Sequence, residues 1–297
     1  MSRVGAAQAY PSRPIHVIVP FPPGGGTDLT ARLMGQWLSE RLGQPFIIEN
    51  RPGGNSNIAT EVVVRAPPDG YTLLAVDSSP AINATYYNKL NFDFIRDIAP
   101  VASIAGQTQI MEVNPSVPAK TVPEFIAYAK ANPGKLNMAS FGNGNISHVC
   151  GELFKMMTGV NMLHVPYRGA GPALADLLGG VISAIEYIRA GRLRALAVTT
   201  ASRLEALQDI PSLSEFLPGY EATDWKGIGM PRNTPPEIID KLNKEINAGL
   251  ADPKLKARFA ELGSPVLPGS PTDFGKLIIQ DTEKWAKVVK FAGIKAD

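Results

Sequence analysis

The chain has 297 residues, of which 44% are hydrophobic and 19% charged, a composition typical of an ordinary soluble globular protein. Its formal net charge is +2 and it has no block of lysine or arginine, which argues against nucleic acid or an anionic membrane surface as the main partner. No apolar stretch approaches the roughly 20 residues that span a bilayer. Cys150 is the only cysteine, which excludes an intramolecular disulfide and a thiolate metal cluster.

The N-terminal part of the chain alternates apolar strand patterns with helical ones. We predict strands over 15–19, 46–49 and 71–76, and helices over 28–42 and 58–65. This alternation indicates right-handed parallel βαβ units buried on both faces. Ligands of open α/β sheets bind beyond the carboxyl ends of the strands, so the loops 20–27, 50–55 and 77–81 are expected to line one site.

The first of these loops is rich in glycine and leads directly into a helix. Gly24, Gly25 and Gly26 permit backbone conformations closed to other residues, and Thr27 or Asp28 is expected to cap the helix. The first amides of a helix have no intrahelical partner, and its positive end favours a carboxylate or phosphate. The alternative is an ordinary glycine-rich turn without a ligand. If an anion binds, the Asp28 carboxylate should turn back to the helix amides, because it would otherwise repel that anion.

A second α/β series follows an extended crossing at 100–114 and precedes another at 218–230. Its own glycine loop, Ser140–Ser147, again lies between a strand and a helix, with Asn145 or Ser147 as candidate caps. The sequence therefore predicts an α/β protein of two lobes, each a mostly parallel sheet flanked by helices, with the two crossings as a hinge. We expect one lobe over 10–101 plus 225–297 and the other over 102–224. The further elements predicted are helices over 122–131, 147–157, 171–178, 235–249, 253–262 and 272–291, and strands over 136–139, 162–165 and 192–199.

Patterns that would indicate chemistry are incomplete. Ser147 stands at the third glycine position of a dinucleotide fingerprint, and no glycine loop runs into Lys-Ser or Lys-Thr. His148 and Cys150 lie two apart on a predicted helix, so their side chains diverge. His16 and His164 lack the spacing of metal ligands. We expect no catalytic residue, no metal and no cofactor.

Six ordered motifs carry a resemblance that runs from about Tyr10 to the C-terminus. The sequence resembles the Bug/TctC family of periplasmic solute-binding receptors of tripartite tricarboxylate transporters. The motifs are Pro20–Asp28, Arg51–Gly54, Asp69–Leu73, Ser140–His148 with Gly151–Phe154, His164–Ala173 and Ala190–Val198.

The resemblance implies a Venus-flytrap receptor in the periplasm that holds a small carboxylate in the interlobe cleft and presents it to membrane permease subunits. It implies no nucleic acid partner, and we expect a monomer. With few fixed cations in the predicted cleft, a mono- or dicarboxylate suits the site better than citrate, and Phe21, Phe141 and Tyr167 would suit an aromatic one. The ligand-binding residues it implies are Phe21, Gly25, Gly26, Thr27, Asp28, Ser79, Ser140, Gly142, Asn143, Asn145, Tyr167 and Asp224.

One interval departs from the family pattern. Between Gly179-Gly180 and Ala190-Gly191 relatives carry a strand, a cleft loop and a short helix, whereas only Val181–Arg189 fills it here. This shortening keeps a second hypothesis open, a receptor homologue that acts as a signalling or partner module. A third, a hydrolase or transferase, would need Ser140 and His148 to rearrange. Ala7-Gln8-Ala9 has a small-x-small pattern, so we expect a trimmed signal sequence and a mature start near Tyr10.

Overall fold

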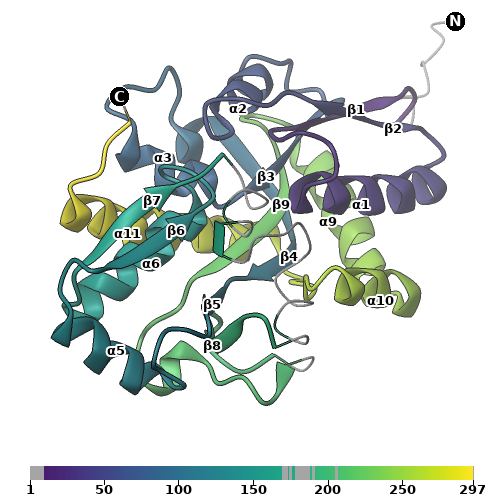
Figure 1. Ribbon diagram of the computed structural model, residues 1–297. Coiled ribbons are helices and arrows are strands. Elements are labelled where there is room, and N and C mark those ends of the chain that lie inside the picture. The colour runs from purple at the N-terminus through teal and green to yellow at the C-terminus, as the bar shows by residue number, and fades with distance from the viewer. Residues whose placement is uncertain are drawn as a thin grey trace, which may run out of the picture. The chain divides into compact units, whose positions relative to one another are not determined.

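A computed structural model describes residues 10–168, 173, 176–177, 188, 191–204 and 207–296 (Figure 1). The expected signal-peptidase site at 7–9, most of the predicted helix 171–178 and the short interval 181–189 apart from Ile188 lie outside these residues. The chain divides into two compact units. Unit 1 comprises Met1–Ala84, Lys89–Gln107 and Trp225–Glu283, and unit 2 comprises Thr85–Asn88, Thr108–Asp224 and Lys284–Asp297.

Unit 1 is built on one five-stranded sheet in the order β2-β1-β3-β9-β4 (Figure 1). β1 pairs in parallel with β2 and β3, as expected for βαβ units, whereas β9 runs antiparallel to β3 and places Lys226 opposite Asp77. The second crossing segment, predicted over 218–230, therefore contains a strand of the central sheet, β9, and is not only a linker. The strands are β1 Ile15–Val19, β2 Phe46–Asn50, β3 Thr72–Asp77, β4 Ile98–Thr108 and β9 Thr223–Pro231.

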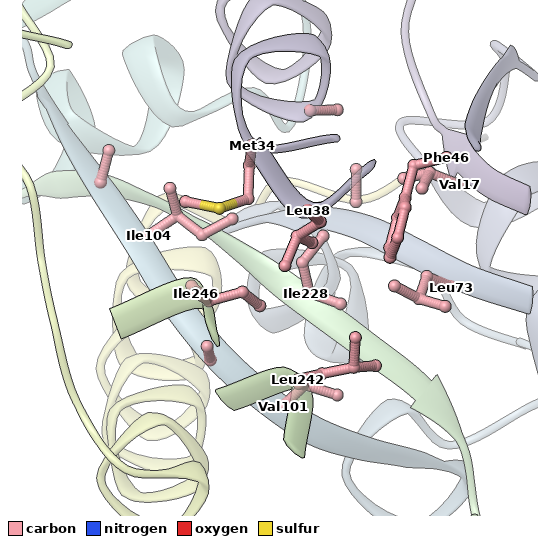
Figure 2. Close-up of a cluster of buried hydrophobic side chains, with 14 of the residues drawn as sticks. Val17, Met34, Leu38, Phe46, Leu73, Val101, Ile104, Ile228, Leu242 and Ile246 are labelled. Atoms are coloured by element: carbon pink, nitrogen blue, oxygen red, sulfur yellow. The ribbon is translucent and has the colours of Figure 1, made fainter. Parts of the chain in front are cut away.

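An apolar core joins this sheet to three helices, α1 (Gly26–Leu42), α9 (Pro236–Ala251) and α10 (Pro253–Glu261) (Figure 2). Met34 and Leu38 of α1 lie in one buried cluster with Leu242 and Ile246 of α9. Burial of each such side chain stabilises the fold by about 1.5–3 kcal/mol. The remaining helices are α2 Asn57–Val64, α3 Ser79–Tyr86, α4 Phe94–Asp97 and α11 Pro271–Ala292.

Unit 2 has shorter sheets. Within the described ranges, β5 pairs only with β8 in an antiparallel ladder and β6 pairs only with β7 in a parallel one (Figure 1). The elements are β5 Ile110–Val113, β6 Leu136–Ser140, β7 Met162–Pro166, β8 Arg194–Val198, α5 Val122–Ala131, α6 Ile146–Thr158 and the 3₁₀ turn η2 Leu213–Glu215.

A cavity of about 490 Å³ lies between these two strand pairs. Ile110–Val113 and Leu136–Ala139 line it with every successive residue. Successive residues of a strand point to opposite faces, so the cavity borders the edges of β5 and β6 rather than one face of either. Glu112 also lines the cavity. Its Oε2 atom has no hydrogen-bond partner among the residues that the structure describes, and burial raises the pKa of this carboxyl to about 7.

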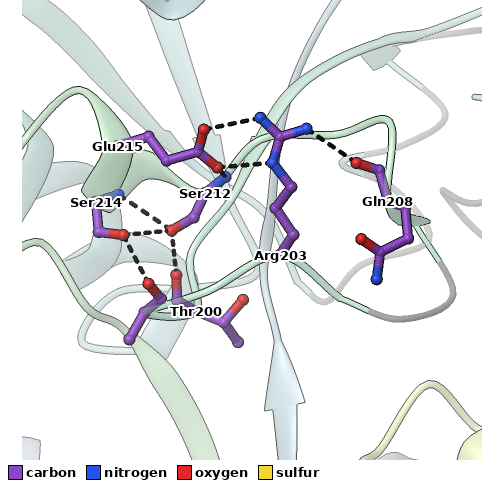
Figure 3. A network of polar contacts seen from close by, with 7 residues as sticks. Thr200, Arg203, Gln208, Ser212, Ser214 and Glu215 are labelled. Carbon is purple, nitrogen blue, oxygen red and sulfur yellow. Dashed lines mark hydrogen bonds and ion pairs between the residues drawn. The ribbon is translucent and has the colours of Figure 1, made fainter.

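The segment after β8 is fixed by polar contacts (Figure 3). Arg203 donates two hydrogen bonds of 2.8 Å to the Glu215 carboxylate and a third, of 3.0 Å, to the carbonyl of Gln208. The bonds from Arg203 lower the pKa of Glu215 to about 2. Ser212 and Glu215 form a capping box on η2. These contacts tie the segment after β8 to η2.

Helix starts and crossings differ from the sequence prediction at a few points. α1 begins at Gly26, and its N-cap, Gly25, has no side-chain cap, so the predicted capping by Thr27 or Asp28 is wrong. The first crossing forms β4 and β5. The loop predicted over 77–81 turns into α3, and α4 was not predicted.

Candidate anion site

The start of α1 leaves several backbone donors without a side-chain acceptor. Gly25 has an extended backbone (φ −77°, ψ 165°), and its carbonyl accepts the first helical hydrogen bond, from Leu29 N–H at 2.9 Å. The amides of Gly26, Thr27 and Asp28 therefore precede the first intrahelical bond. Together with the positive end of the helix dipole, they form an arrangement suited to an anion.

The one carboxylate in this turn is directed away from those amides. Asp28 is buried; its Oδ2 accepts hydrogen bonds of 2.9 Å from Gly24 N–H and from Arg32 Nε, and its Oδ1 accepts one of 2.8 Å from Asn50 Nδ2. Burial alone would raise the pKa of Asp28, but the bonds from Arg32, Gly24 and Asn50 outweigh it and lower that pKa. The expected bonds to the amides of its own helix are replaced by bonds to the preceding loop and to Arg32.

A buried lysine also lies at the start of α1. The side chain of Lys226, on β9, is 1% exposed, and its Nζ donates a hydrogen bond of 2.7 Å to Gln107 Oε1. A Cβ atom at Gly26 would lie 2.8 Å from Gln107 Oε1 and 3.5 Å from Lys226 Nζ. A side chain at position 26 would therefore displace the Gln107 side chain, and an ammonium group lies beside the first residue of the helix.

Sequence reasoning did not place Lys226 among the site residues. Trp225 proves structural: its Nε1 donates to Asp281 Oδ2 at 2.6 Å and its ring meets Phe274 edge-on at 5.3 Å between centroids. The alternation of β9 could have assigned Trp225 and Lys226 to opposite faces, but only the strand order brings Lys226 to α1.

Two further predicted residues of unit 1 follow strand ends. The carbonyl of Phe21, after β1, accepts a hydrogen bond of 2.8 Å from Asn50 Nδ2. Ser79, after β3, is buried at the start of α3, and its amide donates to Asp77 Oδ1 at 3.0 Å. Phe21, Ser79 and the α1 turn are therefore all carried by loops at the carboxyl ends of parallel strands.

In unit 2, the glycine loop after β6 satisfies most of its own donors. Ser140 is buried, shares a hydrogen bond of 2.6 Å with His164 Nε2 and accepts one from Gly142 N–H at 3.3 Å. Asn145 is the N-cap of α6 and accepts from Ser147 N–H at 3.0 Å. Gly144 N–H donates to His148 Nδ1 at 3.2 Å.

The two histidines behind this loop are stacked, with ring centroids 3.6 Å apart and an interplanar angle of 6°. Burial, with a smaller contribution from the neighbouring His164, lowers the pKa of His148 to about 3, and burial lowers that of His164 to about 4. Both rings are therefore neutral at pH 7 and act as hydrogen-bonding supports of the loop.

The remaining predicted residues of unit 2 lie in different settings. Asn143 is exposed at the tip of the glycine loop. The hydroxyl of Tyr167, after β7, donates to Asp176 Oδ2 at 2.8 Å. Asp224 is 8% exposed at the start of β9. Unit 2 thus brings Ser140, Gly142 and Asn145 together within one loop, and Asn143 offers its side chain outward.

Other kinds of site find no support in the described part of the chain. No group of three or more His, Cys, Asp or Glu side chains there is arranged to hold a metal ion. Among the same residues, no helix is both long and apolar enough to cross a membrane. Ser140 and His164 are hydrogen-bonded to each other, as a catalytic serine and its base would be. However, Ser140 has an exposed fraction of 0%, and its Oγ also donates to the carbonyl of Gly142 in the same loop.

Residues 30–294 match the family model described as the tripartite tricarboxylate transporter family receptor, TctC. BugT of Bordetella pertussis is 35% identical over 301 residues, which cover 98% of this chain and 92% of BugT. A Rhodopseudomonas palustris protein solved with adipate has a TM-score of 0.85 and 37% identity, covering 96% of this chain and 99% of that one. MatC of the same species, solved with malate, has a TM-score of 0.80 and 30% identity, covering 94% and 100%.

The chain therefore belongs to the TctC family of receptors, which includes the Bug proteins. Its fold is the two-lobed α/β fold of periplasmic binding proteins, as the sequence predicted. Members of this family are solute-binding proteins, and the members solved with ligands include complexes with small dicarboxylates.

Proposed function

We propose that this protein is a periplasmic receptor that captures a small mono- or dicarboxylate and delivers it to the membrane permease of a tripartite tricarboxylate transporter. The observation that carries the proposal is the start of α1, where backbone amides without a side-chain cap adjoin a buried ammonium while Asp28 is turned away. The adipate and malate complexes of relatives support a carboxylate as the ligand.

Gly25, Gly26 and Thr27 would supply the principal contacts to one carboxylate, since they begin the helix. Asn143, which is exposed on the glycine loop of unit 2, is proposed as a ligand contact from that unit, as are Tyr167 and Asp224. Ser140, Gly142 and Asn145 would act by shaping the loop, because their polar atoms bond within it. Phe21 and Ser79 border the α1 turn and would line the ligand's flank.

Binding without catalysis fits the described residues better than hydrolysis. A serine nucleophile must reach the substrate, whereas Ser140 is fully buried and its Oγ is engaged by His164 and Gly142. We further propose that the receptor acts as a monomer and that a signal sequence directs it to the periplasm.

Thermal unfolding with a panel of carboxylates tests the proposal. The panel should contain adipate, malate, benzoate and citrate, with adipamide as the uncharged control. A ligand at one hundred times its Kd stabilises the folded state by about 2.7 kcal/mol. We expect at least one mono- or dicarboxylate to raise the midpoint in proportion to the logarithm of its concentration. If no carboxylate shifts the midpoint, the receptor proposal fails and the signalling or partner module becomes the better account.

A further inference from the structure

We infer that Lys226 is a specificity-determining residue: its buried ammonium pairs with the ligand carboxylate at the α1 turn, so the site selects a fully ionised group over a neutral isostere. The inference rests on the proposed function and deepens it. Neither the motifs that define the family resemblance nor the predicted site residues include this lysine.

The geometry places the ammonium where an anion at the α1 turn would lie. Nζ is 3.5 Å from the position a Cβ would take on Gly26, the first residue of the helix. A carboxylate that accepts hydrogen bonds from the Gly26 and Thr27 amides therefore lies within the reach of an ion pair with Nζ. Gln107, whose Oε1 accepts from Nζ at 2.7 Å, fixes the lysine side chain in that direction and is a positioning residue.

Burial strengthens the electrostatic interaction of the Lys226 ammonium with a nearby anion. Lys226 is 1% exposed, and charges act far more strongly on one another away from water than at the surface. Asp77 faces Lys226 across the β3–β9 ladder, and opposite residues of an antiparallel pair share a face. Asp77 belongs to β3, whereas the Nζ atom of Lys226 lies next to Gly26, the first residue of α1.

The central experiment crosses two ligands with two proteins by isothermal titration calorimetry. Adipate and adipamide have the same length and differ in charge, and the proteins are the wild type and Lys226→Met, which retains most of the side-chain volume. We expect Lys226→Met to weaken adipate binding about 10- to 100-fold, as loss of a hydrogen bond to a charged group does. Adipamide affinity, weak in both proteins, should change by less than about threefold. Lys276→Met, an exposed lysine in α11, makes the same change in net charge and should leave adipate affinity unchanged.

A second variant keeps the inference testable if Lys226→Met does not fold. Gly26→Ala retains the lysine but puts a methyl group 2.8 Å from Gln107 Oε1, so the Gln107–Lys226 pair must shift. We expect it to weaken adipate binding while adipamide again responds little. Gly275→Ala, whose new methyl group would meet only Pro100 at 3.4 Å, is the matched glycine control.

The outcomes separate the two proposals. If the wild type binds no carboxylate of the panel, the proposed function is overturned and this inference with it. If the wild type binds adipate and Lys226→Met binds it equally well, the receptor stands and the lysine has only a structural role beside Asp77. Equal losses for adipate and adipamide would likewise contradict a role in charge selection.

Discussion

The two units are both built from strands and helices, but their sheets differ in the number of strands. Unit 1 has five strands in the order β2-β1-β3-β9-β4, with β3 between the first parallel pair and the crossing strand. Within the described residues of unit 2, β6 and β7 match the parallel pair β1 and β2, and β5 matches the crossing strand, but no strand joins them. The cavity of about 490 Å³ lies at that place. Among the described residues, the cavity therefore separates the parallel pair of unit 2 from its crossing strand, whereas β3 joins the corresponding strands of unit 1.

The glycine loops of the two units differ as well. In unit 1 the helix after the loop has a glycine N-cap without a side-chain bond, which leaves amides available to a ligand. In unit 2 Asn145 caps α6. The side chains of Ser147 and His148 accept hydrogen bonds from the amides of Phe141 and Gly144. Similar strand–loop–helix motifs can therefore have different capacities for anions, and unit 1 should contribute more of the binding energy.

The largest effect that we expect from the difference between the units is that unit 2 unfolds before unit 1 as the pH falls. The pKa values of His148 and His164 are lowered to about 3 and 4 in the folded state, against about 6.5 unfolded. The unfolded chain takes up these protons first, so the histidines' contribution to stability is present above pH 6.5 and declines as the pH falls toward 4. Glu112, with a raised pKa of about 7, works in the opposite direction between about pH 4.5 and 7, but it is one group against two.

Amide hydrogen exchange at pH 7, 5.5 and 4.5 would test this expectation. Peptides from α6 and β7 should lose protection before peptides from β1 and β3. His148→Phe keeps a ring in the stack but removes one titrating group, so its decline with acid should be shallower. At pH 7 that variant should be less stable by about 1–3 kcal/mol, because Gly144 N–H loses its acceptor. Equal loss in both units would contradict the prediction.

Two substitutions of alanine, one in the buried core of unit 1 and one beside the cavity of unit 2, should show a smaller difference in stability. Ala75 of β3 is 3% exposed in the unit 1 core, so Ala75→Leu should overpack it and lower the free energy of unfolding by about 1–3 kcal/mol. Ala139 of β6 lines the unit 2 cavity, so Ala139→Leu has room to extend into it and should be neutral or stabilising. Urea unfolding of the two variants measures the contrast. Similar destabilisation by both would show that the cavity is already filled.

Much of the fold was predictable because apolar periodicity specifies strands and helices locally. β1 and α5 have the predicted bounds, and most other described elements differ by one or two residues at their ends. α3 was missed because Ser79–Tyr86 mixes polar and apolar residues without a helical stripe, so packing rather than pattern decides it. The anion loop was predictable from its glycines. Lys226 was not, because its role depends on β9 inserting between β3 and β4, a non-local pairing that no local pattern encodes.

The most direct test of the central claim, that a carboxylate is captured at the start of α1, is amide hydrogen exchange with and without a saturating carboxylate from the panel. The account predicts that exchange slows in peptides covering residues 24–29 more than in peptides from α10, which contributes no residue to the proposed site. It also predicts that, once the ligand is lowered to near the wild-type Kd, this protection is largely lost in Lys226→Met. Saturable binding that leaves residues 24–29 unprotected would contradict the account.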